Sequence, residues 1–248
     1  MSGNGISSEL LSSLSYPEGY WGPRLIFDQI SMIAEAFDLS SCDAVSYAEN
    51  LSGNSLPRGA EGFFAFPRID SVRNRHFPKV RGSRERYREV VRFALTILSN
   101  SHGSNGSLGD WAKMDSVGVC DRTSRAIATI SKEQSGDILV VPAQFGLFHC
   151  CYPASQAFDV FREEEFGLDC FAVACMIFTH PARLSSENQL FVDCPGNEFL
   201  PRSSERFGGV PSFCFQNDEI ELRGHWPTDP ADISHASVSA FSINNGVK

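Results

Sequence analysis

Residues 137–144 read Asp-Ile-Leu-Val-Val-Pro-Ala-Gln, a short apolar run with a polar residue at each end. Runs of this kind are typical of buried β-strands, because a strand that is covered on both faces carries apolar side chains at every position. We therefore expect a strand over 137–142. Ser135-Gly136 forms the turn into this strand from a helix that we expect over 121–134.

Two more apolar runs lie downstream, at residues 171–178 and 190–192. The second run predicts a strand over 188–194. Over 168–179 the sequence is compatible with a strand or with a helix, because periodicity does not separate the two in so short a run.

Polar residues that are capable of chemistry follow each of the three runs. Open α/β sheets place ligands just beyond the carboxyl ends of their parallel strands. If the three runs are neighbouring parallel strands, one rim of the sheet collects the side chains of Gln144, His149, His180 and Asp193.

Amphipathic helices are expected between these strands. The clearest covers 84–99, and another runs from Pro23 to about Leu39. A strand is expected at 62–66, and the alternation over 212–222 predicts a β-hairpin. Interleaved helices and strands that end in a β-rich part predict an α/β single domain, with a mixed, partly parallel sheet flanked by helices and a β-hairpin-rich C-terminal part.

The domain organisation follows from length and local composition. Residues 1–18 are rich in Ser and Gly, and we expect a flexible N-terminal arm there. A chain of 248 residues accommodates one large domain, which we place at 19–248 with the 100–110 loop as the candidate internal boundary. Residues 40–60 are expected to form a loop, and the tail from His225 is weakly patterned.

The charge is distributed unevenly along the chain. Residues 1–135 carry 15 basic and 15 acidic residues, whereas 136–248 carry 6 and 15, so the second half holds the whole net charge of −9. Residues 68–92 hold nine basic residues and three acidic ones. Three roles are open for this basic segment. The first two are binding of a phosphate-bearing partner and docking against the acidic second half within the chain, in an oligomer or with a protein partner. The third is a solvated face with local ion pairs such as Glu85–Arg88 and Glu89–Arg92.

Several function classes are disfavoured by composition. The acidic chain lacks the basic footprint and the stacking aromatics of a nucleic-acid binder, so we expect no nucleic-acid partner. The N-terminus does not resemble a signal peptide and no apolar run is long enough to span a membrane, so we expect a soluble cytoplasmic protein without membrane contact. The eight cysteines include no C-x-x-C pair and are expected to be reduced and mostly packed in the core.

The rim residues suggest two kinds of catalytic site. His149, His180 and Asp193 form a two-histidine, one-carboxylate set that suits a divalent metal, with Glu198 as the general base and Cys150 or Cys194 as alternate ligands. Such a metal would activate water for hydrolysis near neutral pH.

A second version needs no metal. Cys194 would be a thiolate nucleophile paired with His180 or His149, and Gln144 or Asn197 would stabilise an oxyanion. The same residues also fit ordinary structural roles, since Asp193-Cys-Pro-Gly196 is a common exit from a strand and Thr179-His180-Pro181 is a common helix start.

Two functional hypotheses follow from the sequence. The first is a hydrolase that uses the rim residues, with a divalent metal as its cofactor. The second is a non-catalytic interaction protein that assembles with itself or with a partner through the basic 68–92 segment and the acidic C-terminal half.

Overall fold

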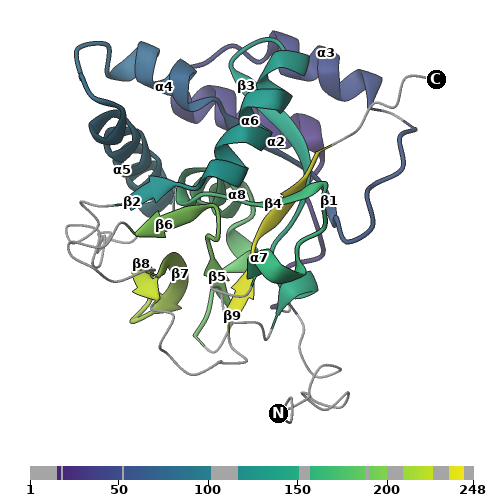
Figure 1. Cartoon of the computed structure of the whole chain (residues 1–248), viewed down its shortest axis with the longest axis vertical. Helices are drawn as coiled ribbons and strands as arrows, with labels where there is room; N and C mark the ends of the chain where they lie inside the picture. Colours follow the sequence, from purple (N-terminus) through teal and green to yellow (C-terminus); the bar gives the residue numbers. More distant parts are fainter. Residues whose placement is uncertain are drawn as a thin grey trace.

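The computed structural model describes most of the chain (Figure 1). The described residues are 16–17, 19–51, 53–101, 117–150, 157–187, 190–199, 209–225 and 235–242. Most of the predicted flexible arm at 1–18 and most of the 100–110 loop lie outside them, so the proposed domain boundaries remain predictions. Tyr16, at the end of that arm, is described, and its hydroxyl hydrogen-bonds to Glu61 and to the backbone N–H of Leu147.

Helices dominate the first half of the chain and strands dominate its C-terminal part. The described helices are α2 (Ile26–Phe37), α3 (Cys42–Asn50), α4 (Ile69–His76), α5 (Ser83–Ser101), α6 (Asp121–Glu133), α7 (Ala157–Val160) and α8 (Cys170–Thr179), with short 3-10 turns η2 (Leu147–His149) and η4 (Pro181–Arg183).

The first sheet is antiparallel. Its strand order is β1 (Gly62–Pro67), β3 (Ile138–Gln144), β10 (Ser239–Phe241) and β4 (Glu165–Gly167). β3 is buried along its whole length, as its continuous apolar run predicts.

The second sheet is mixed. Its strand order is β8 (Glu219–His225), β7 (Val210–Gln216), β5 (Phe191–Asp193) and β9 (His235–Ser237), and only the β5–β9 pairing is parallel. A two-stranded sheet pairs β2 (Val117–Val119) with β6 (Asn197–Phe199). The predicted α/β class with a partly parallel sheet and a C-terminal hairpin is therefore confirmed.

A single residue, Val238, separates β9 from β10, so this short segment passes from the mixed sheet into the antiparallel one. The backbone N–H of Val238 donates to Asp193 O at 3.1 Å, and its carbonyl accepts the N–H of Leu168 at 3.2 Å. The weakly patterned tail thus contains the two strands that join the sheets, which the sequence analysis did not predict.

The apolar run at 171–178 is a helix, α8, and not a strand. Asp169 caps it, because its Oδ1 accepts the backbone N–H of Ala172 at 2.9 Å. Its residues are apolar on every face, as in a helix that is buried all round, and all of them except Phe178 are buried.

The rim that three neighbouring parallel strands would form does not exist. The middle run is helical. The other two, β3 and β5, lie in different sheets, and both neighbours of β3 run antiparallel to it. Other elements of the fold therefore position the predicted rim residues Gln144, His149, His180 and Asp193.

α5 confirms the predicted amphipathic helix and packs against α8. The residues of its apolar face are all buried: Tyr87, Val90, Val91, Ala94, Leu95 and Leu98. Together with α2, β1, β3 and α8, this face forms one continuous hydrophobic core. The segment 40–60 was expected to be a loop but contains α3, whose buried residues are Ala44 and Ala48.

No helix in the described part of the chain has the length and apolar character that crossing a membrane requires.

Candidate functional site

Two of the predicted rim residues, Gln144 and His149, belong to one buried hydrogen-bond network at the centre of the first sheet. His149 Nε2 and Glu165 Oε1 lie 2.5 Å apart. Ser239 donates to the same Glu165 oxygen and accepts a hydrogen bond from Gln144 Nε2 at 2.8 Å. The other amide N–H of Gln144 donates to Ser237 O at 2.9 Å, so the whole amide side chain is engaged.

Gly146 also belongs to this network, and its position requires a glycine. Gly146 has a φ of 108°, and a Cβ at this position would lie 2.6 Å from Ala236 O. Only glycine therefore allows the turn after β3 to approach β9 so closely. The backbone N–H of Gly146 donates to Gln144 Oε1 at 2.5 Å.

The His149–Glu165 pair is closed off from solvent. The side chain of His149 is 5% exposed and that of Glu165 is 0% exposed. The His149 ring packs between Phe148 and Phe161, with ring centroids 4.8 and 5.0 Å away. Burial raises the pKa of Glu165, but the hydrogen bonds from His149 and Ser239 outweigh it, so the net pKa is lowered.

Asp193 lies in a second buried polar group, in the mixed sheet. Its Oδ1 accepts hydrogen bonds from Ser212 Oγ at 2.7 Å and from His235 Nδ1 at 2.8 Å. Its Oδ2 is buried and has no hydrogen-bond partner among the described residues. Ser237 faces Asp193 across the parallel β5–β9 pairing, and its buried hydroxyl also lacks a described partner.

His180 lies apart from both groups, at the end of α8. Its Nε2 accepts the backbone N–H of Arg24 at 2.9 Å, so Nδ1 carries the proton and donates to Met176 O at 2.9 Å. The ring packs against Phe64 and Phe145, and burial lowers the pKa of His180 to about 4. A neutral imidazole with both nitrogens engaged ties the N-terminal segment to α8.

The three predicted metal ligands thus have separate surroundings. His149 pairs with Glu165, Asp193 pairs with His235, and His180 contacts backbone groups. Nowhere in the described ranges do three or more His, Cys, Asp or Glu residues form a group that could hold a metal ion.

The remaining predicted catalytic residues are placed as follows. Cys194 is fully buried, and burial raises the pKa of its thiol well above the ordinary value, which disfavours the thiolate that a nucleophile needs. The Oδ1 of Asn197 accepts the N–H of Cys170 at 2.6 Å, and its Nδ2 donates to Tyr87 Oη at 2.7 Å. Glu198 pairs with Gly118 through its backbone, and its side chain lies outside the described residues.

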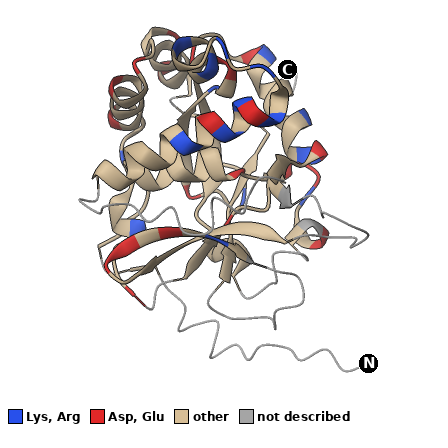
Figure 2. Cartoon of the chain, turned by 90° about the vertical axis from the view of Figure 1, so that its left-hand side faces the viewer, with Lys and Arg blue, Asp and Glu red and all other residues tan. Residues whose placement is uncertain are grey.

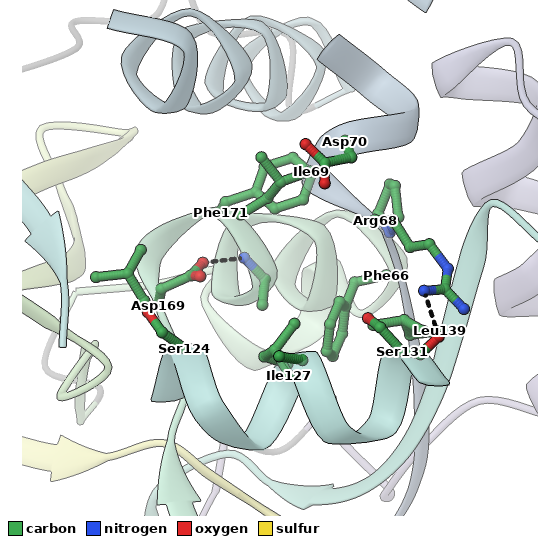
Figure 3. Close-up of a pocket in the computed structure, with 14 residues that line it drawn as sticks. Phe66, Arg68, Ile69, Asp70, Ser124, Ile127, Ser131, Leu139, Asp169 and Phe171 are labelled. Atoms are coloured by element: carbon green, nitrogen blue, oxygen red, sulfur yellow. Dashed lines mark hydrogen bonds between the residues drawn. The ribbon is translucent and has the colours of Figure 1, made fainter. Parts of the chain in front are cut away.

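A pocket lies elsewhere in the molecule, between the N-terminal ends of α4 and α8 and one face of α6 (Figure 3). Its volume is about 510 Å³. Most of its lining is apolar and comes from segments far apart in sequence, including Phe66, Ile69, Ile127, Leu139 and Phe171. Pockets of this size and apolar character are typical binding sites for small molecules.

α6 leaves this space open because it covers the core incompletely. Thr123 and Ile130 are its buried residues, whereas Ile127 is only half-buried and lines the pocket. Ile127 thus packs against the edge of the core and also presents apolar surface to the pocket.

The polar groups of the pocket lie at opposite sides, with Asp169 and Ser124 on one and Arg68 and Ser131 on the other (Figure 3). Arg68 is already engaged, since its Nη1 donates to Ser131 O at 3.0 Å and its Nη2 donates to Gln134 O. Asp70, close to Arg68 in sequence, pairs with Arg73 at 2.9 Å.

Asp169 is a buried acidic residue in the lining of this pocket. The residue is 5% exposed. Burial raises its pKa to about 6, although the backbone N–H groups of Ala172 and Phe171 favour the charged form. A carboxyl group with a pKa near neutrality that lines a pocket is a frequent feature of functional sites.

The sequence analysis did not single out Asp169. The available signal was an acidic residue directly before an apolar run, which is also the signal of a helix N-cap. That signal would have favoured a helix over 168–179, but it carries no information about the pocket, because the pocket walls come from α4, α6 and β1 as well.

The basic segment 68–92 spans α4, the following turn and most of α5. The predicted Glu89–Arg92 pair is present at 3.0 Å, and Arg75 pairs with Asp38 at 2.5 Å. Basic and acidic residues alternate along the outer face of α5 (Figure 2). Lys79, Arg81 and Arg84, at the α4–α5 turn, are exposed.

The pocket and the two buried polar groups occupy different parts of the fold. A further buried polar cluster joins Glu61 to Tyr16 and Tyr20, with the fully buried Arg183 beside it. No protein-family model, curated protein or solved structure matches this chain.

Proposed function

We propose that this protein binds a small organic molecule with a mostly apolar body in the pocket between α4, α6 and α8. The observation that carries the proposal is the pocket itself, a space of about 510 Å³ with apolar walls and polar groups at opposite sides. A ligand with an apolar body would remove the walls from water, and each square ångström of apolar surface that is buried contributes roughly 25 cal/mol.

The hydrolase hypothesis has less support. Its residues are distributed over the His149–Glu165 network, the Asp193–His235 pair and the backbone contacts of His180. Both histidine–carboxylate pairs are almost completely buried. A general base needs to reach the proton that it removes, and the pocket provides that access whereas the buried pairs do not.

A fluorescence titration with the neutral apolar dye Nile red tests the proposal. We expect the dye to bind the wild-type protein with one site and a blue-shifted emission. The variant Ile127→Trp would fill the pocket, and we expect it to lose at least ten-fold in affinity. The matched control Lys132→Trp adds the same side chain to an exposed position of α6 outside the pocket and is expected to bind like the wild type. Equal binding by both variants, or no binding by the wild type, contradicts the proposal.

Charge-driven assembly is a second candidate function. It is favoured by the exposed Lys79, Arg81 and Arg84 at the α4–α5 turn of a chain whose second half is acidic. Sedimentation at low and high salt tests it, because attraction between exposed charges weakens once the screening length falls below about 10 Å. We expect a larger species at low salt that Arg84→Glu abolishes, and an unchanged monomer at both salt concentrations contradicts this candidate.

A further inference from the structure

We propose that the ligand of the α4–α6–α8 pocket carries a cationic amine beside its apolar body, and that Asp169 pairs with this amine. The inference rests on the proposed binding function and deepens it by naming the class of ligand. It depends on the placement of Asp169, a buried acidic side chain in a wall of the pocket.

The carboxylate of Asp169 has no cationic partner in the part of the chain that the structure describes. Within the described ranges, no Lys, Arg or His lies within ion-pair distance of its carboxylate. The groups that stabilise its charged form are the backbone N–H groups of Ala172 and Phe171. Buried charges in proteins are normally paired with an opposite charge, so an unpaired carboxylate that lines a cavity indicates a partner that arrives with the ligand.

Other charges also line the pocket. Arg68 and Asp70 lie away from Asp169, and Asp70 is paired with Arg73 at 2.9 Å. Both terminal nitrogens of Arg68 donate to backbone carbonyls, which leaves this cation poorly placed to bind an anionic ligand. The formal charge of the lining residues is −1, and Asp169 is the acidic residue of the lining that has no cationic partner in the described part of the chain.

A contact between Asp169 and an ammonium group would be strong. A hydrogen bond between two charged groups is roughly twice as strong as one between neutral groups, and the attraction grows when water is excluded. The apolar side chains of Ile127 and Phe171 would exclude water from an ammonium group at Asp169. A hydroxyl group at the same position could donate a hydrogen bond but would leave the buried charge uncompensated.

The experiment is a competition titration of bound Nile red with three probes that share one apolar body. Tryptamine carries the cation, indole-3-ethanol is its neutral counterpart and indole-3-propionate is the anion. At pH 7.5 we expect tryptamine to displace the dye with at least ten-fold higher affinity than the alcohol, and the acid to be the weakest. If Nile red binds but tryptamine shows no advantage over the alcohol, the inference is wrong and the binding function still stands. If Nile red itself does not bind, the binding function fails.

The variant Asp169→Asn assigns the effect to this side chain. Asparagine is also a good N-cap and has nearly the same shape, so α8 is expected to remain intact. We expect the variant to bind tryptamine and indole-3-ethanol within two-fold of each other. An unchanged preference for tryptamine in this variant overturns the inference.

A second variant keeps the test informative if Asp169→Asn does not fold. Ser124→Lys would place an internal ammonium group on the side of the pocket where Asp169 lies. We expect it to weaken tryptamine at least ten-fold while indole-3-ethanol changes less than three-fold. Equal effects on both probes would indicate simple steric obstruction and contradict the pairing with Asp169.

Discussion

Glu165 and Asp169 are two buried acidic residues only four positions apart, yet their surroundings differ. Glu165 faces His149 and Ser239, which both hydrogen-bond to its carboxylate. Asp169 lines a pocket and has two backbone N–H groups as its described stabilisers. The pKa of Glu165 is accordingly lowered and that of Asp169 is raised to about 6.

This difference distinguishes a structural acid from a candidate binding group. A histidine–carboxylate pair resembles catalytic machinery, but the His149–Glu165 pair is closed, with hydrogen bonds that join β3, β4, β10 and η2. An acid that lacks a charged partner is costly to the fold, and such a cost is expected where a ligand supplies the missing charge. We therefore assign a structural role to Glu165 and propose a binding role for Asp169 in addition to its role as the N-cap of α8.

The largest expected effect is that of Glu165→Ala. The substitution leaves His149 and Ser239 buried without their shared acceptor, and we expect the free energy of unfolding to fall by about 3–5 kcal/mol. Urea denaturation at pH 7 measures it, with Glu163→Ala at an exposed position as a control that changes it by less than about 0.5 kcal/mol. Because the folded pKa of Glu165 is lowered, its contribution is present at neutral pH and is lost as pH falls through that lowered pKa.

A small loss for Glu165→Ala, comparable with that of Glu163→Ala, would break the comparison. It would mean that the network does not stabilise the fold, and a catalytic role for His149 and Glu165 would regain weight.

The next effect is the pH dependence of Asp169→Asn. The folded pKa of Asp169 is raised from 3.8 to about 6, so the wild-type protein loses stability as pH rises through this window. Relative to the variant, which cannot titrate here, the loss amounts to about 3 kcal/mol between pH 3.5 and pH 7.5. The acidic groups that face Asp169, namely Tyr87, Cys170, Cys175 and Cys194, all have raised pKa values and stay neutral in this range.

Thermal unfolding of both proteins at several pH values measures this prediction. A difference in stability that is constant with pH would show that Asp169 titrates normally, and the contrast with Glu165 would then disappear.

The smallest effects come from two serines in the β9–β10 segment. Ser239→Ala removes a donor to Glu165 and an acceptor of Gln144, and we expect it to lower the free energy of unfolding by about 1–3 kcal/mol. Ser237→Ala removes a buried hydroxyl that has no described partner, and we expect it to raise stability by about 1 kcal/mol. Chemical denaturation of both variants sharpens the comparison, and a loss at Ser237 equal to that at Ser239 would contradict it.

The two predicted residues Gln144 and His149 share one hydrogen-bond network, which shows how much local sequence information can predict. Gln144 is the last residue of β3 and His149 lies five positions further on, so the short connection keeps both in one network. Their partners Glu165 and Ser239 were not predicted, since β4 and β10 are three residues long and carry too little pattern to be recognised alone.

The residues of the C-terminal tail show the same limit of local sequence information. His235, Ser237 and Ser239 are polar and look like a loop in sequence, yet all three are buried. Their roles depend on distant residues: Ser237 pairs with Asp193 and Ser239 with Gln144 in the two sheets, and the ring of His235 hydrogen-bonds to Asp193.

The sequence by itself determined the elements whose pattern is long and periodic: α2, α5, α6, the buried strand β3 and the β7–β8 hairpin. In these segments the apolar positions repeat often enough to define one buried face, whatever packs against it. Only the tertiary structure decided that residues 170–179 are a helix, that β9 and β10 join the two sheets, and that Asp169 lines a pocket. The physical reason is that burial, hydrogen-bond partners and pKa belong to the surroundings that distant segments create, and a local stretch of sequence does not specify those surroundings.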